Sequence, residues 1–225
     1  EDLDIFDENT WCTINSFHDI DAIQNYFIET GFKISAHLKF DTGMGRMGIH
    51  YSQAKDILSK IKQCNAINLK GVYSHFSTAE KIDSTFMDLQ RSRFDEIIDF
   101  SNTLFTDLIY HISNSGAIFN NINNHYDMVR PGIALYGVTL FGKTHKKLNP
   151  VMHFKAPVIL KKEILKGESV GYNQTYIAEK DFVMAVVQAG YADGIPMEFS
   201  NSGVVVWNGT KLPIVGKVSM DLITI

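Results

Sequence analysis

The sequence has little cysteine and no long apolar run. Its two cysteines, Cys12 and Cys64, have no C-x-x-C partners, which excludes a disulfide framework and predicts a reducing compartment. No apolar stretch reaches the roughly 18 residues of a membrane span, and the acidic start EDLDIFDEN is unlike a signal peptide. We therefore expect a cytoplasmic protein with no membrane partner.

Basic tracts are absent as well. The net charge is −4 and the pI is near 6.1, so no cluster of cations is available to neutralise nucleic-acid phosphates, and we expect no nucleic-acid partner. The eight histidines invite a metal site, but no pair has zinc spacing such as H-E-x-x-H. We expect no bound metal.

The most informative stretch is ISAHLKFDTGMGRMG, residues 34–48. Apolar and polar residues alternate from Ile34 to Asp41, which predicts a strand with one buried face. Gly43, Gly45 and Gly48 then allow a tight turn in which the guanidinium of Arg46 could bind an anion.

The same glycines match G-x-G-x-x-G, the fingerprint of dinucleotide-binding folds. In that fingerprint the glycines open directly into a helix, and an acidic residue follows about 20 residues later. Here the next helix is expected only from about Ser52, and no Asp or Glu occurs between Ser59 and Ala79. A nicotinamide-dependent dehydrogenase is therefore the weakest of the alternatives.

The chain up to about residue 145 alternates strands with helices, which indicates an α/β domain with parallel crossovers. Helices are expected from Ser16 to Thr30, from Ser52, from Asp83 to Phe105 and briefly after Ser115. The expected strands are Trp11–Asn15, Ile34–Asp41, Leu69–Phe76, Leu108–Ser113 and Met128–Tyr136.

Beyond Gly142–Pro150 the pattern becomes β-like. Turns containing Lys-Gly, Asp-Gly and Asn-Gly separate the apolar segments. We predict two domains, 1–145 and 146–225, with strands in the second over Phe154–Leu165, Phe182–Ala189, Val204–Trp207 and Leu212–Ile225.

Polar residues follow several of the expected strands: Asp41 to Arg46, His75, Asn114 with Ser115, and Arg130. The carboxyl ends of parallel strands share one face, so these groups are expected to form one site. Taken alone, His75 could be a hydrogen-bonded core histidine, and Asn114-Ser115 could be only a helix cap. Arg130 is harder to explain structurally, because a buried guanidinium without a partner is expensive.

The chain resembles the alanine racemases, pyridoxal-phosphate enzymes built on a barrel with an appended β-domain. The matching blocks occur in family order: KFDTGMGRMG from Lys39, YSHFSTAE from Tyr73, SNSGA from Ser113, VRPGIALYG from Val129, AGYADG from Ala189 and IVGKVSMD from Ile214. The resemblance implies a partial (β/α)8 TIM-type barrel, about strands four to eight, followed by part of a mainly-β domain.

The resemblance also implies the activity: interconversion of L- and D-alanine by two-base proton transfer, which supplies D-alanine for peptidoglycan. Tyr191 would remove the proton on the L-face and would come from the second subunit of a homodimer. His75, with Arg130 behind it, would support the phenol. Arg130 would donate to the pyridine nitrogen of the cofactor.

The remaining roles follow in the same way. Arg46 would bind the cofactor's phenolic oxygen and the substrate carboxylate. Ser115, with the backbone of Gly132 and Ile133, would hold the phosphate. Met220, from the partner subunit, would contact the small amino-acid substrate. Lys39 matches a structural lysine of the family that is often carbamylated, and we reject it as the imine-forming residue.

The family's imine-forming lysine lies in a motif like V-K-A-N-A-Y-G-H-G, and no segment of this sequence matches it. We therefore expect a fragment, inactive alone, that begins after the third barrel strand and stops within a strand. Two alternatives remain. One is a racemase of another amino acid such as serine. The other is a non-catalytic pyridoxal-phosphate-binding barrel protein, which the β-like block from Phe154 argues against.

Overall fold

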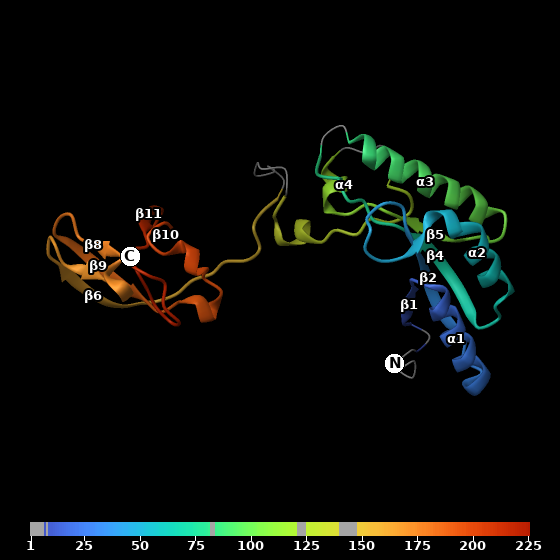
Figure 1. Ribbon diagram of the computed structural model, residues 1–225, viewed down its shortest axis with the longest axis horizontal. Helices are drawn as coiled ribbons and strands as arrows, with labels where there is room; N and C mark the ends of the chain where they lie inside the picture. The colour runs from blue at the N-terminus through green and yellow to red at the C-terminus, as the bar shows by residue number, and fades with distance from the viewer. Residues whose placement is uncertain (1–6, 8, 82–83, 121–124, 140–147) are drawn as a thin grey trace. The chain divides into compact units, whose positions relative to one another are not determined.

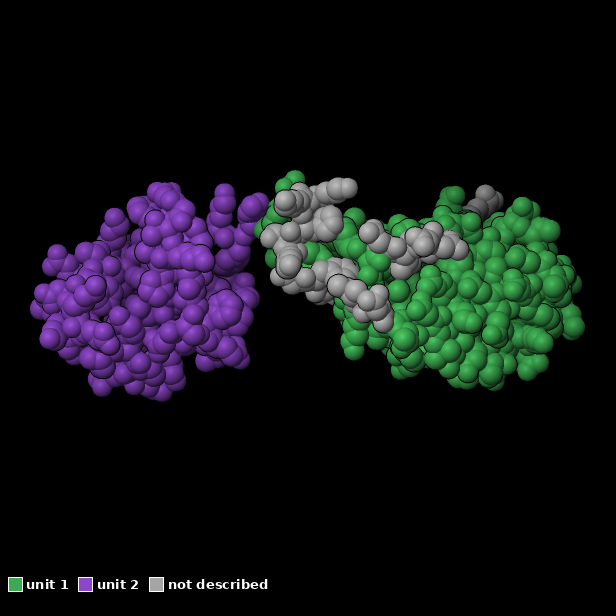
Figure 2. All heavy atoms as spheres, turned by 90° about the horizontal axis from the view of Figure 1, so that it is seen from above, with its two compact units in different colours: residues 1–152 green, residues 153–225 purple. Residues whose placement is uncertain are grey.

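The computed structural model describes residues 7, 9–81, 84–120, 125–139 and 148–225 (Figure 1). The chain divides into two compact units, unit 1 (Glu1–Met152) and unit 2 (His153–Ile225), coloured separately in Figure 2. The predicted domain boundary at residue 146 lies outside the described residues. In the described parts of the chain, no helix has the length and apolarity needed to cross a membrane.

Unit 1 contains a parallel sheet with strand order β1-β2-β4-β5, and the short β3 pairs with the end of β2. Strands and helices alternate along the chain, which confirms the α/β class. The strands are β1 (Trp11–Ile14), β2 (Ile34–Asp41), β3 (Ile49–His50), β4 (Ile67–Tyr73) and β5 (Ile109–His111). The helices are α1 (Phe17–Thr30), α2 (Ala54–Gln63), α3 (Thr85–Asn102) and α4 (Ser115–Phe119), with a 3-10 turn at Tyr51–Gln53.

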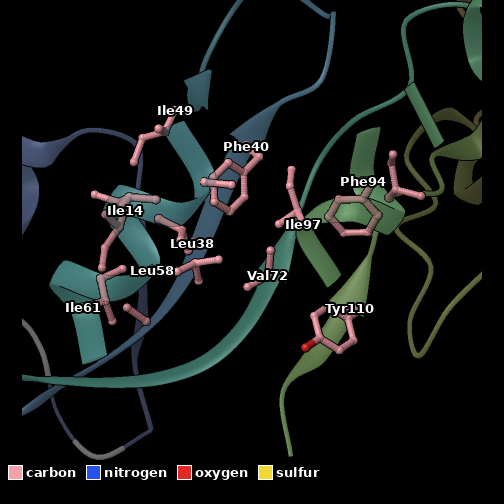
Figure 3. Packing of buried hydrophobic residues seen from close by; sticks show 14 of the residues in the cluster. Ile14, Leu38, Phe40, Ile49, Leu58, Ile61, Val72, Phe94, Ile97 and Tyr110 are labelled. Carbon is pink, nitrogen blue, oxygen red and sulfur yellow. The ribbon is translucent and has the colours of Figure 1, made fainter. Parts of the chain in front are cut away.

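The core lies between one face of this sheet and the helices. Leu38 and Phe40 of β2 are fully buried with Leu58 of α2 and Ile97 of α3 (Figure 3). This is the apolar half of the alternation predicted for Ile34 to Asp41. The other half, which includes His37 and Lys39, therefore points to the opposite face of the sheet.

Local sequence signals set the helix ends. The Ser16 hydroxyl accepts a hydrogen bond from the Asp19 N–H at 3.2 Å, and the Asp19 carboxylate accepts one from the Ser16 N–H at 3.1 Å. This is the capping box expected from the sequence. Gly31 ends α1 with a φ of 72°, a left-handed conformation that glycine adopts without strain.

One expected strand is wrong. Met128–Tyr136 does not join the sheet, so the run of strands expected from four to eight is not completed by this segment. Ile133–Tyr136 forms a 3-10 helix instead. Pro131 has no N–H to give to a strand ladder, and the N–H of Leu135 bonds back to the Gly132 carbonyl at 3.0 Å.

Unit 2 consists of short antiparallel β-elements, as its turn-rich sequence indicates. One sheet has the order β12-β9-β6, and two hairpins pair β7 with β8 and β10 with β11. The expected strand Leu212–Ile225 is instead two short strands, and Gly216 between them has a φ of 79°. The strands are β6 (Val158–Ile164), β7 (Ser169–Val170), β8 (Tyr176–Ile177), β9 (Phe182–Val187), β10 (Val204–Trp207), β11 (Thr210–Pro213) and β12 (Ile223–Thr224). Short 3-10 turns occupy Tyr172–Gln174, Tyr191–Asp193 and Met197–Phe199.

Replacing Ser16 with Ala should lower the free energy of unfolding of unit 1 by about 1 kcal/mol, because the first turn of α1 loses its cap. The change can be measured by urea denaturation in a Trp207→Phe background, where Trp11 fluorescence reports on unit 1. Ser92→Ala, an exposed mid-helix change in α3, is the control and should cause no loss. A Ser16→Ala protein as stable as its parent would contradict this account.

Candidate functional site

The face of the unit 1 sheet opposite the helices carries a row of polar and aromatic groups. Lys39, Tyr73 and His111 pair in register across β2, β4 and β5. The Tyr73 ring stacks on the His111 ring at 4.7 Å between centroids, and the Lys39 Nζ lies 5.5 Å from the Tyr73 centroid. Strand pairing therefore places cationic and titratable groups side by side at the carboxyl ends of neighbouring strands.

Arg130 lies at the centre of this group. Its Nη2 donates to the Ser74 carbonyl oxygen at 2.6 Å and lies 3.3 Å from His75 Nδ1, and its Nη1 donates to His111 Nδ1. Its guanidinium carbon is 4.9 Å from the Tyr73 centroid. Among the described residues, the ion pairs are Lys60–Asp21 and Arg91–Asp88, so Arg130 is held by neutral acceptors and an aromatic face. Burial lowers the pKa of Arg130 from its ordinary value.

His75 is partly buried beside that guanidinium. Burial lowers the pKa of His75 to about 4, and the positive charges of Arg130, Arg46 and Lys39 act in the same direction. The imidazole is therefore neutral near pH 7. Arg130 Nη2 faces His75 Nδ1 and Asn114 Nδ2 faces His75 Nε2, both at 3.3 Å. Since both of these groups can only donate, the neutral ring accepts from one of them at a time.

Asn114 fixes the other side of that ring. Its Nδ2 lies 3.3 Å from His75 Nε2 and also donates to the Phe76 carbonyl at 3.0 Å. Its Oδ1 accepts from the Ala117 N–H at 3.1 Å, which caps α4. The helix-cap interpretation of Asn114 is thus confirmed, and the same residue also borders the site.

The glycine loop after β2 is shaped by Asp41. Burial alone would raise the pKa of Asp41, but the N–H groups of Gly43, Gly45 and Met44 outweigh it and lower the pKa. The Asp41 carboxylate accepts from the Gly43 N–H at 2.9 Å and from the Gly45 N–H at 3.0 Å. These amides are therefore already bonded within the loop, unlike those of a phosphate-binding dinucleotide turn. Arg46 is exposed on the same loop.

A buried glutamine of α3 joins this loop to the loop that carries His75. Gln90 is fully buried, and its Nε2 donates to the His75 carbonyl at 3.0 Å and to Thr42 Oγ1 at 3.4 Å. Its Oε1 accepts from the Ser77 N–H at 3.0 Å. Arg93, one turn further along α3, donates to the Thr42 carbonyl at 2.8 Å. Helix α3 therefore sets the spacing of two loops at the site.

The residues expected to hold a phosphate group also lie together. Ser115 Oγ accepts from the Gly132 N–H at 2.8 Å and from the Ala134 N–H at 3.3 Å. A Cβ added at Gly132 would meet only Ser115 Oγ, at 3.8 Å, so the space in front of the glycine is open. Ile133 beside it is 38% exposed. The Gly132 and Ala134 N–H groups converge on the Ser115 oxygen, so the hydroxyl keeps its own proton to donate to a group such as a phosphate.

In unit 2, Tyr191 and Met220 lie on adjacent segments. The Tyr191 N–H donates to the Ser219 carbonyl at 2.9 Å, and the Ala192 N–H donates to the Met220 carbonyl at 3.0 Å. A Cβ on Gly190 would come within 2.2 Å of the Met220 carbonyl oxygen, so this approach requires glycine. Both side chains are about half exposed, at 46% and 55%. The structure thus brings together the two residues assigned to a partner's site.

Sequence reasoning missed His37, His111 and Gln90. His37 Nδ1 lies 2.8 Å from His111 Nε2, and the latter is bonded through Nδ1 to Arg130. The signal available was period-two alternation, which places His37 on the polar face with Lys39, and His111 opposite the buried Tyr110. Gln90 could have been noticed as a polar residue between the apolar positions Met87 and Phe94.

Replacing Gln90 with Leu should destabilise unit 1 by about 1 to 3 kcal/mol, because buried partners at Ser77 and His75 lose their hydrogen bonds. Urea denaturation followed by Trp11 fluorescence in the Trp207→Phe background provides the measurement. Gln63→Leu, at the C-terminal end of α2, is the control for the change of residue type. Equal stability of the two variants would contradict the assigned role of Gln90.

The buried imidazoles should make unit 1 sensitive to acid. Burial lowers the pKa of His111 to about 3, with Arg130 and His37 acting in the same direction, whereas the unfolded chain binds protons below about 6.5. The contribution of neutral His111 to the free energy of unfolding is therefore fully present above about pH 6.5. It is lost progressively as the pH falls toward the lowered pKa of His111. Urea midpoints at pH 7, 6 and 5 measure this loss. His111→Asn, which keeps an acceptor but does not titrate, should flatten the dependence, and an unchanged slope would refute the assignment.

Comparisons with known proteins identify the family. Residues 1–140 match the family "Alanine racemase, N-terminal domain", and residues 151–225 match "Alanine racemase, C-terminal domain". The alanine racemase of Syntrophobacter fumaroxidans is 38% identical over 84% of this chain and 51% of its own length. That of Francisella tularensis subsp. tularensis is 34% identical over 97% of this chain and 60% of its own length.

Solved structures give the same result. The alanine racemase of Streptomyces lavendulae has a TM-score of 0.87 and 28% identity, over 95% of this chain and 58% of its own. That of Bartonella henselae, solved with covalently bound pyridoxal phosphate, has a TM-score of 0.81 and 32% identity, over 94% and 58%. The chain thus spans between half and two thirds of the length of these relatives. Both family matches together cover nearly every residue, and the chain belongs to the alanine racemase family.

Proposed function

We propose that the protein carrying this chain interconverts L-alanine and D-alanine with pyridoxal 5′-phosphate as its cofactor. Family membership and the names of the relatives support the reaction, and the ligand of the Bartonella henselae structure supports the cofactor. The observation that carries the proposal is the placement of Arg130 between two neutral imidazoles at the carboxyl ends of the strands. The same unit also holds Ser115, whose hydroxyl oxygen accepts from the Gly132 N–H.

We also propose that unit 1 is part of a (β/α)8 barrel and that unit 2 is part of a β-domain, with a functional boundary near residue 146. The parallel strand order, the helices packed on one face and the polar groups at the carboxyl ends of strands support the barrel. The family matches end at 140 and begin at 151, on either side of that boundary.

The residues of the site fit the proposed cofactor. Ser115 Oγ and the N–H groups of Gly132 and Ile133 would hold its phosphate, and Arg46 would bind its phenolic oxygen and the substrate carboxylate. When bound, pyridoxal phosphate supplies an electron sink that acidifies the α-proton of an amino acid. Arg130 would donate to the pyridine nitrogen, and a guanidinium that does not release its proton would leave that atom unprotonated.

Proton transfer on the L-face is assigned to Tyr191 of a second subunit in a homodimer. A phenol ionises near pH 10 in water, so it needs a donor or a cation beside it to act as a base near pH 7. His75, with the Arg130 guanidinium behind it, would supply these interactions. Met220, held beside the Tyr191 segment, would close the substrate side of the site.

Lys39 is proposed to be structural. It is 9% exposed, and burial followed by the charges of Arg46 and Arg130 lowers its pKa. A lowered pKa favours the neutral amine, which is the form that reacts with carbon dioxide to give a carbamate. The imine would be formed by a different lysine, in a motif absent from these 225 residues, so this chain alone is proposed to be inactive.

Mixed dimers of the full-length protein test whether the site is shared. Tyr191→Phe and the double variant His75→Asn/Arg130→Gln should each lose about a hundredfold or more in kcat/KM for alanine. After random subunit exchange, the mixture should recover about a quarter of wild-type activity, because half the dimers are hybrids and each hybrid has one intact site. D-alanine formation by chiral chromatography is the readout.

The same assay separates the alternatives. If Tyr191 acted within its own subunit, both sites of every hybrid would be defective and no activity would return. Comparable kcat/KM values for serine would favour a racemase of broader specificity, since Arg46 recognises only a carboxylate. Turnover by the 225-residue chain alone would overturn the assignment of the imine lysine, and no turnover by the full-length wild type would overturn the proposed function.

A further inference from the structure

The His37 side chain extends from β2 across β4 to His111 on β5, and the residue of β4 that it passes is a glycine. His37 lies on β2 and His111 on β5, and these strands are separated by β4. Gly71 of β4 pairs with His37, and a Cβ on Gly71 would stand 2.4 Å from the Ile109 carbonyl oxygen and 3.0 Å from the His37 Cε1 and Nε2 atoms. The absence of that Cβ lets the two imidazoles meet at 2.8 Å, between His37 Nδ1 and His111 Nε2.

Arg130 bonds to His111, and His111 bonds to His37. The arginine therefore determines which nitrogen carries the proton in each of the two histidines. Arg130 can only donate, so His111 Nδ1 must accept and the His111 proton must lie on Nε2. That N–H must then be donated to His37 Nδ1, which places the His37 proton on its own Nε2. We propose that His37 is a positioning residue, which locks the His111 ring with Nδ1 toward Arg130 and thereby holds the guanidinium in one orientation.

The reverse order of protons is excluded by the same contacts. If His37 Nδ1 carried the proton and donated to His111 Nε2, the His111 proton would move to Nδ1 and face the N–H groups of Arg130. Protonation of either ring would place two donors against each other in the same way. Only the neutral pair with both protons on Nε2 satisfies the contact with Arg130.

The Nε2 side of the His37 ring, away from His111, supports a role beyond packing. His37 is 9% exposed, and its Nε2 is buried with no hydrogen-bond partner among the described residues. A buried unpaired N–H is unfavourable, so an apolar residue would be preferred here if only space needed filling. The feature that an apolar residue lacks is the acceptor at Nδ1, and that acceptor is the atom directed at His111.

Aromatic neighbours restrict both rings. Trp11 lies 5.3 Å from the His37 ring between centroids, at an angle of 39°. Tyr73 stacks on His111 at an interplanar angle of 12°. These contacts hold the planes of the two imidazole rings, and the hydrogen bonds then determine which nitrogen faces which partner.

The order of hydrogen bonds stands independently of the reaction, whereas its effect on catalysis rests on the proposed function. If Arg130 donates to the cofactor, loss of the His37–His111 hydrogen bond should impair the chemical step more than substrate binding, because the substrate carboxylate is assigned to Arg46 instead. The expected signature is a lower kcat with a nearly unchanged KM for alanine.

The first test is NMR of the full-length protein with 15N-labelled histidine. A scalar coupling between His111 Nε2 and His37 Nδ1 should be visible across the hydrogen bond, and both histidines should show a protonated Nε2 and an unprotonated Nδ1 at pH 7. His37→Leu should abolish the coupling, while Leu38→Ala, on the buried face of the same strand, should preserve it. A proton on Nδ1 of His111, or no coupling in the wild type, would overturn the proposal.

The second test compares two substitutions that both remove the unpaired Nε2. Asn places an acceptor near the former Nδ1 position, and Leu does not. His37→Leu should lower kcat about tenfold with KM within about threefold, the size expected for one lost hydrogen bond, whereas His37→Asn should stay within about threefold of wild type. Leu38→Ala should lower stability without this kcat effect.

Equal losses of kcat in His37→Asn and His37→Leu, or an unchanged kcat in His37→Leu, would contradict the positioning role of His37. If the wild-type protein does not racemise alanine, the proposed function fails while the NMR result still decides the order of the hydrogen bonds.

Discussion

The arrangement of unit 1 depends on how Arg130 is stabilised. Among the described residues it has no carboxylate partner, and it is surrounded by the Ser74 carbonyl, the Nδ1 atoms of two histidines and the face of Tyr73. A cation in such a site requires each neighbour to present an acceptor or a π-face. Burial keeps both histidines neutral, and the charge of Arg130 lowers their pKa values further, so each ring can present an acceptor to the guanidinium.

The sheet supplies the geometry that Arg130 needs. Register aligns Lys39, Tyr73 and His111 across neighbouring strands, and Gly71 leaves the gap through which His37 reaches His111. Helix α3 then ties the loops at the strand ends together through Gln90. The site therefore combines strand pairing, which is set by the backbone, with one buried amide that fixes the distance between loops.

The sequence predicted what is local and missed what depends on pairing. The buried face of β2 and the cap of α1 follow from period and from Ser16, and His75 and Ser115 gather because parallel strands end on the same side. Met128–Tyr136 looked like a strand by its apolar residues, but Pro131 prevents a regular ladder. The contact of His37 with His111 could not be predicted, since it depends on which strands are neighbours and on Gly71 between them.

The glycine loop has a further consequence for how a ligand arrives. Because the Asp41 carboxylate already bonds the Gly43 and Gly45 amides, the loop is ordered when the protein folds. A ligand that contacts Arg46 therefore meets a rigid turn and loses little entropy in ordering the backbone. Reordering of this loop backbone is then not a step that such a ligand has to wait for.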